Sequence, residues 1–169
     1  MRKLAFFLCM TAALAVAADT LSGRRAPGFS LPDSTFAQHD LADYRGKWLL
    51  IDYMQTNCPH CRNLTKLLEA KKVQHKGKFE ILSVVITPPD TQATVKAYMA
   101  ANGVTGAIAF DQGQMALSYF RATPANPSFD TPHLFAIDPN GNIVHDWNQG
   151  EVEDKGFPGA LDLMLNVKK

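Results

Sequence analysis

Two stretches of the chain, Trp48–Met54 and Phe79–Ile86, are almost continuously apolar. Such runs are typical of central strands that are covered on both faces, as in α/β proteins. Between them, the apolar residues from Cys61 to Leu68 recur at spacings of three and four, which predicts a helix with one buried face. Asn57 is the expected N-cap of this helix, and the basic residues and glycine at 75–77 are expected to end it.

The rest of the chain continues the alternation of short strands and helices. Pro88-Pro89 should stop the second strand, and the Asn140-Gly141 pair indicates a hairpin. The other predicted elements are a strand and turn around Phe29, Leu31 and Phe36, a helical turn at Leu41–Arg45, a helix from Asp90 or Thr91 to Asn102, a strand at Ile108–Phe110, a helix at Gly113–Phe120, hairpin strands at His133–Ile137 and Ile143–Trp147, and a helix at Phe157–Val167. Residues 19–26 are expected to form a loose lead-in. This order predicts an α/β fold with a mixed sheet flanked by helices.

The N-terminus has the pattern of an export signal. Met1-Arg2-Lys3 is followed by an apolar run from Leu4 to Ala18, which is shorter than the ~20 residues that a membrane-spanning helix needs. Ala15-Val16-Ala17 supplies small residues for cleavage. We therefore expect a signal peptide over residues 1–17, an exported, periplasmic domain over 18–169, and contact with the membrane only if the segment is retained as an anchor.

Composition narrows the function classes. The 169 residues are 46% hydrophobic and 20% charged, which suits one globular domain. A formal net charge of +1 without a basic stripe argues against a nucleic-acid partner. With Cys9 in the signal peptide, only Cys58 and Cys61 remain, so the exported chain has no second cysteine pair for a structural disulfide or a zinc site. The two thiols are therefore expected to carry the chemistry, with no bound metal.

Cys58-Pro59-His60-Cys61 stands where the first helix should begin. Unpaired N–H groups and the helix dipole favour a thiolate at Cys58, and only a thiolate attacks a disulfide. Cys61, one turn later, is placed to resolve the mixed disulfide that would form at Cys58. Pro59 suits the first helical turn, and His60 adds a hydrogen-bond donor near the thiol.

In these residues, the chain resembles the thioredoxin-like superfamily, in particular its exported TlpA/ResA-like branch. The resemblance lies in Ala26–Leu31, the strand that ends at Asp52, the C-P-H-C motif, Thr131-Pro132 and the hairpin around 137–141. It implies a thioredoxin fold with a short N-terminal β extension. It also implies a thiol-disulfide oxidoreductase that acts on cysteines of other exported proteins, draws on an upstream redox partner, and needs no cofactor besides its own cysteine pair.

The same resemblance assigns roles to residues outside the motif. Asp52 corresponds to a buried acid that exchanges a proton with Cys61, and burial should raise the pKa of such a carboxyl. Pro132 corresponds to a cis-proline beside the disulfide, and Thr131 would then face the cysteines. Gln55 is a candidate substrate contact, with a solvated loop side chain as the alternative. His133 is expected to be a core-edge histidine bonded to backbone rather than part of the site.

The sequence leaves two alternatives: the direction of electron flow, and a copper-binding function in place of disulfide exchange. The overall pattern resembles a reductase, whereas the Pro59-His60 dipeptide is that of DsbA-type oxidants. A Sco-like copper chaperone is the alternative function, because Ile86–Thr91 resembles that family and thiolates bind Cu(I). Sco proteins, however, use C-x-x-x-C and a histidine for which His133 is a displaced substitute. A peroxidase is disfavoured because the threonine and proline that it needs are Gln55 and Ile51 here.

Overall fold

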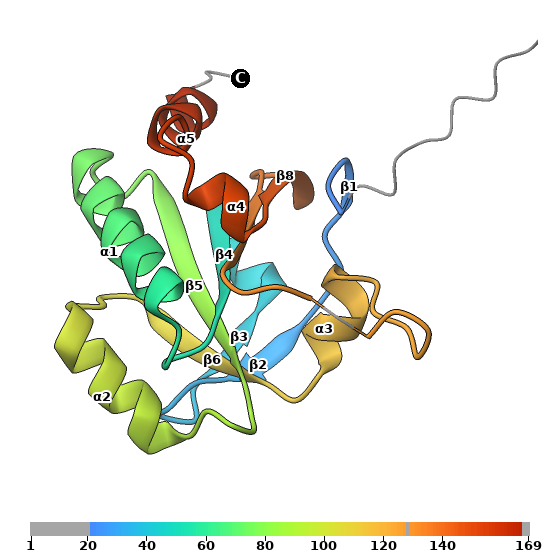
Figure 1. Ribbon diagram of the computed structural model, residues 1–169. Helices are drawn as coiled ribbons and strands as arrows, with labels where there is room; N and C mark the ends of the chain where they lie inside the picture. The colour runs from blue at the N-terminus through green and yellow to red at the C-terminus, as the bar shows by residue number, and fades with distance from the viewer. Residues whose placement is uncertain (1–20, 128, 167–169) are drawn as a thin grey trace, which may run out of the picture.

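The structure, a computed structural model, describes residues 21–127 and 129–166, so the predicted signal peptide lies outside the described residues. Six strands of this part form one mixed sheet in the order β1-β8-β7-β4-β5-β6 (Figure 1). They are β1 (Arg24–Arg25), β4 (Trp48–Met54), β5 (Phe79–Ile86), β6 (Ala107–Asp111), β7 (His133–Ile137) and β8 (Asn142–Trp147). β4, β5 and β6 are parallel, whereas β7 is antiparallel to β4 and β8. Within these residues, no helix combines the length and the apolar character that crossing a bilayer requires.

One face of the sheet is covered by α1 (Pro59–Gln74), α2 (Gln92–Asn102) and α5 (Phe157–Asn166), which Figure 1 shows on the same side of the central strands. Side chains alternate along a strand, so every second residue of β4 points to this face. Leu50 packs there with residues of α1 and α5, and Met54 packs with both cysteines and with α2. Asp52 stands between these two positions on β4 and therefore lies beneath α1.

The opposite face is covered by α3 (Gln114–Tyr119) and by the N-terminal extension, a two-stranded hairpin of β2 (Ser30–Pro32) and β3 (Gln38–Asp40). Phe29 and Leu31 belong to the same core cluster as Ile51, Tyr53 and other residues of this face. A 3-10 turn, η1 (Leu41–Tyr44), leads from the extension into β4. The extension thus contributes buried residues to the hydrophobic core.

The structure corrects several local predictions. Cys58, not Asn57, is the N-cap of α1, because the Cys58 sulfur accepts the backbone N–H of Cys61. The strand and turn predicted around Phe29, Leu31 and Phe36 are present, and Phe36 lies in the hairpin turn with φ 66° and is 74% exposed. The lead-in at 19–26 contains β1, which pairs with β8 and so extends the sheet by one strand. The short helix α4 (Gln149–Val152) was not predicted. Its N-cap is Asn148, whose side chain accepts the N–H of Glu151.

Candidate functional site

Cys58 and Cys61 form a disulfide across the first turn of α1, with their Cα atoms 5.3 Å apart. Cys58 has extended backbone angles, as an N-cap residue does, and Pro59 occupies the first helical position, where its missing N–H costs nothing. The backbone N–H of Cys61 lies 3.1 Å from Cys58 Sγ. The same N–H and the helix dipole would stabilise a negative charge on this sulfur after reduction.

The two sulfurs differ in access. Cys58 is 9% exposed, whereas Cys61 is fully buried in the cluster that also holds Met54 and Val95. The carbonyl oxygen of Thr131 lies 3.9 Å from Cys58 Sγ, and the Thr131–Pro132 peptide bond is cis. The structure therefore places Thr131 and Pro132 beside the Cys58 sulfur, at the point where β7 begins.

Asp52 is fully buried on β4, and among the described residues neither of its carboxylate oxygens has a hydrogen-bond partner. Burial raises the pKa of this carboxyl to about 7, and the hydroxyl of Thr65 on α1 opposes the rise. A carboxyl with such a pKa exchanges its proton near neutral pH, as a general acid or base must. Asp52 thus has the burial and the raised pKa that the sequence predicted for it, whereas its proton exchange with Cys61 stays a prediction.

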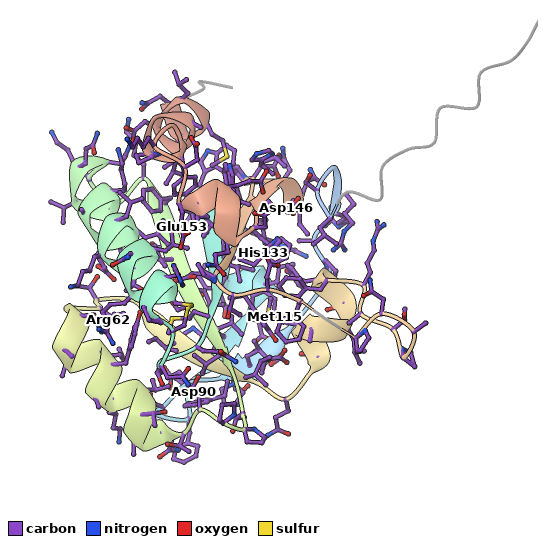
Figure 2. All side chains as sticks on the ribbon, viewed as in Figure 1. Arg62, Asp90, Met115, His133, Asp146 and Glu153 are labelled. Carbon is purple, nitrogen blue, oxygen red and sulfur yellow. A yellow bond between two sulfur atoms is a disulfide. The ribbon has the colours of Figure 1, made fainter. Side chains whose placement is uncertain are left out.

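The remaining predicted residues surround the motif. His60 is half-exposed, and its Nδ1 pairs with the carboxylate of Glu153, which follows α4. Figure 2 shows Glu153 on the α4 side of the site. Gln55 contributes its backbone carbonyl, which accepts the N–H of Cys58 at 3.2 Å, so it helps to shape the turn before the helix.

Asp90 near the site was missed by the sequence reasoning, and His133 has other partners than predicted. The carboxylate of Asp90, which is buried, accepts hydrogen bonds from the backbone N–H and the hydroxyl of Thr56, and so fixes the loop that leads to Cys58. His133 follows Pro132 and is bonded to the carboxylates of Asp130 and Asp146, at 3.3 and 3.1 Å, rather than to backbone as predicted. Figure 2 shows His133 and Asp146 next to each other.

The spacing of Asp130 and His133 gave a hint of the first of these two contacts, because residues so close along the chain meet easily at a strand start. The contact with Asp146 depends on the pairing of β7 with β8 and left no local signal. In the described part of the chain, no cluster of three or more His, Cys, Asp or Glu side chains is arranged to hold a metal ion.

A central mixed sheet, helices on both faces, and a cysteine pair at a helix start beside a cis-proline define a protein of the thioredoxin-fold class. The chain belongs to the AhpC/TSA family, whose model matches residues 22–146. The thioredoxin fold predicted from the sequence is confirmed, and so is the resemblance to ResA-like proteins.

Curated relatives support this placement. A protein named thiol-disulfide oxidoreductase ResA from Geobacillus kaustophilus is 30% identical over 122 residues, which cover 72% of this chain and 66% of the relative. The chain therefore spans slightly less than two thirds of that protein. The thioredoxin-like protein YneN from Bacillus subtilis is 24% identical over 142 residues, covering 83% of this chain and 79% of the relative.

Solved structures show the same fold at low sequence identity. A putative protein disulfide isomerase from Bacteroides thetaiotaomicron has a TM-score of 0.73 and 21% identity, and the match covers 88% of this chain and 89% of that one. BsSco, a member of the Sco family of cytochrome c oxidase assembly proteins, has a TM-score of 0.67 and 18% identity over 89% of this chain and 98% of that one. The fold by itself therefore does not separate disulfide exchange from a Sco-like function.

Proposed function

We propose that the protein is an exported thiol-disulfide oxidoreductase that exchanges disulfides with cysteines of other proteins through Cys58 and Cys61. The observation that carries the proposal is the asymmetric pair at the start of α1, in which Cys58 is 9% exposed and Cys61 is fully buried. The relatives named as thiol-disulfide oxidoreductases support it.

In the reduced protein, the Cys58 thiolate attacks a substrate disulfide, forms a mixed disulfide and releases the first substrate thiolate. Asp52 then takes the proton of Cys61, and the Cys61 sulfur attacks Cys58 and releases the second substrate thiolate. The Thr131–Pro132 segment lies beside Cys58 and positions the substrate chain there. The reverse sequence of steps reduces the protein and oxidises a partner dithiol, so the same site serves either direction.

Alkylation of the reduced protein with iodoacetamide tests the proposal directly. Cys58 should react faster at neutral pH than a free peptide thiol, because the helix start lowers its pKa and so enlarges its thiolate fraction. Cys61 in the Cys58→Ala variant is the matched control and should react slowly because it is buried. A Cys58 thiol that reacts no faster than the peptide thiol would rule out the proposed exchange chemistry.

The direction of electron flow follows from the reduction potential, which we expect His60 to raise. An imidazole near Cys58 favours the reduced thiolate, and anything that stabilises the reduced form makes the disulfide a stronger oxidant. His60→Pro should therefore lower the reduction potential, as measured by equilibration with glutathione. Glu153→Gln is a useful companion variant, since it removes the carboxylate that pairs with His60. An unchanged potential in His60→Pro would show that the dipeptide does not tune the pair.

Copper transfer is the second candidate function, because a Sco structure shares this fold and two thiolates bind Cu(I). A titration of the reduced protein with Cu(I) under a competing chelator separates the two. We expect Cu(I) to bind less tightly than the competing chelator. Tight binding at one equivalent that is lost in Cys58→Ser would favour the copper function.

Export is part of the proposal, and it rests on the sequence pattern of residues 1–17. Expression of the full chain in a Gram-negative host, followed by fractionation and mass spectrometry, tests it. The product should be periplasmic and begin at Ala18. A full-length product in the membrane fraction would indicate a retained anchor instead.

A further inference from the structure

Asp52 presents a problem that the proposed mechanism does not solve. The carboxyl must take a proton from Cys61 and later release it, yet it is fully buried and neither oxygen has a hydrogen-bond partner among the described residues. A buried group that cycles between two protonation states needs a route for the proton to reach water. The question is which groups on the covered face of β4 supply that route.

Thr65 is the polar side chain that affects the pKa of Asp52. It lies on α1 four residues after Cys61, and hence on the same face of the helix. It is 3% exposed, and its hydroxyl lowers the pKa of Asp52 against the larger effect of burial. No hydrogen bond joins this hydroxyl to the Asp52 carboxyl in the disulfide form, so one must form before a proton can pass between them. In the disulfide form this hydroxyl is hydrogen-bonded to the Tyr98 hydroxyl of α2 at 2.8 Å, and either oxygen can be the donor.

Tyr98 connects this pair to the surface. It is 5% exposed, and it lines a cleft of about 530 Å³ between α1 and α2, together with Arg62 and Lys66. Burial raises the pKa of the Tyr98 phenol, the Thr65 hydrogen bond lowers it, the charge of Asp52 raises it and the charge of Arg62 lowers it. Tyr98 is therefore close enough to interact electrostatically with both the buried Asp52 and Arg62 of the open cleft. Figure 2 shows Arg62 on the α1 side of this region.

We propose that the Thr65–Tyr98 hydroxyl pair is the proton route between Asp52 and the solvent in the cleft between α1 and α2. This inference rests on the proposed function, in which Asp52 serves Cys61. Two hydroxyls in series suit the task because each is a donor and an acceptor at once, and each can rotate to pass a proton in either direction.

The proton leaves Asp52 in the half of the cycle that reduces the substrate and oxidises the Cys58–Cys61 pair to the disulfide. Cys61 gives its proton to Asp52, the Cys61 sulfur bonds to the Cys58 sulfur, and the substrate sulfur leaves with the electron pair of the broken bond and takes a proton from water. The Asp52 proton then passes to the Thr65 oxygen while the Thr65 proton passes to Tyr98. Tyr98 releases its proton to water in the cleft, so both hydroxyls are restored and the protein ends as a disulfide.

The rate of proton exchange at Asp52 tests the route without requiring turnover. In the oxidised protein near pH 7, the NMR signal of the Asp52 carboxyl carbon should be a single averaged line, because the proton enters and leaves quickly. In Thr65→Val and Tyr98→Phe, the exchange rate should fall by about tenfold or more, which broadens or splits this line at the titration midpoint. Thr65→Ser keeps the hydroxyl and should restore the averaged line.

Single-turnover kinetics give the second measurement. Reduced protein mixed with dithiobis(nitrobenzoate) releases one thionitrobenzoate when Cys58 attacks and a second when Cys61 attacks the mixed disulfide. Both variants should slow only the second release, and only below pH 7, where Asp52 must first lose its proton. Tyr44→Phe removes a tyrosine hydroxyl that bonds His39, away from the site, and should leave both phases unchanged.

The outcomes distinguish this inference from the proposed function. If Thr65→Val and Tyr98→Phe exchange the Asp52 proton as fast as the wild type, the hydroxyl route is wrong and the proton leaves elsewhere. If the wild-type Cys58 fails the alkylation test, the proposed function is wrong, whereas the NMR measurement on the disulfide form still reports whether the route exists.

Discussion

Asp52 shows how a single buried side chain links stability to function. A carboxylate that is removed from water and has no hydrogen-bond partner destabilises the folded state unless it takes up a proton. The fold supplies the burial through β4 and α1, and the reaction uses the resulting pKa. The burial that raises the pKa of Asp52 for proton exchange is therefore the same burial that lowers the stability of the folded state.

Asp52→Asn should remove a pH dependence of stability that the wild type shows. The folded-state pKa of about 7 lies above the ordinary value of 3.8, so the folded protein binds the proton more tightly than the unfolded chain does. Wild-type stability should thus fall as pH rises from about 4 to about 7 and level off above it. Since one pKa unit corresponds to about 1.4 kcal/mol, the variant should be more stable than the wild type by about 2–4 kcal/mol at pH 8.

Urea unfolding of the oxidised protein at pH 5 and pH 8 measures this difference. Asp154→Asn is the control, because Asp154 is exposed and an asparagine keeps the acceptor for the Gly156 N–H. Stability curves that run parallel in the wild type and Asp52→Asn would show that Asp52 titrates at its ordinary value.

Helix α1 carries the cysteines at one end and is anchored to α5 at the other. Lys71 Nζ and His75 Nε2 contact the two carboxylate oxygens of Asp162 at 2.5 and 2.7 Å. Both Lys71 and His75 are buried residues. The hydrogen bond from Lys71, followed by that from His75, lowers the pKa of Asp162. The anchor therefore fixes the helix on which the redox pair is built, far from the pair itself.

Asp162→Asn should lower the free energy of unfolding by about 1–3 kcal/mol, because it leaves two buried donors without a charged partner. The reduction potential should stay unchanged, since the contact lies at the last turn of α1, at the opposite end of the helix from the cysteines. Glu80→Gln is the matched control. It removes a carboxylate that pairs with Lys47 and Lys72 on the surface, where an ion pair contributes at most about 1 kcal/mol. Equal losses in the two variants would contradict the special role of the anchor.

The molecule as a whole depends on the N-terminal extension to close one face of its sheet. Phe29 is 6% exposed, packs against Tyr119 of α3 with ring centroids 6.3 Å apart, and shares a core cluster with residues of β4 and β5. Without the extension, the part of this face that α3 does not cover would lie open to water. The domain therefore folds as one unit with its N-terminal extension.

Phe29→Ala and Phe36→Ala form a matched pair of variants within the same extension. The first should cost about 3–5 kcal/mol, as for other buried phenylalanines, and lower the melting temperature accordingly. The second removes a 74% exposed ring and should change stability by no more than about 0.5 kcal/mol. Thermal unfolding followed by circular dichroism measures both. A small loss in Phe29→Ala would mean that the extension is not part of the cooperative core.

Local patterns predicted most of this architecture. The apolar runs of β4 and β5 are long and uninterrupted, and the Asn140-Gly141 turn admits few alternatives to a hairpin, so these elements appear where the sequence placed them. Weak signals failed: β1 has two residues and exists only because β8 offers it a pairing edge. The capping of α1 by Cys58 was also missed, because cysteine is not among the usual N-cap residues.

The sequence by itself determined the class of fold through the order of its apolar and amphipathic segments. It determined the cysteine pair and the acid that precedes it through residue types at short spacings along one segment. Only the tertiary structure decided which further groups meet around that pair: Glu153 on His60, and Thr65 with Tyr98 near Asp52. These contacts join residues from different strands and helices. Their distances are set by how the elements pack, and no local pattern in the chain records that packing.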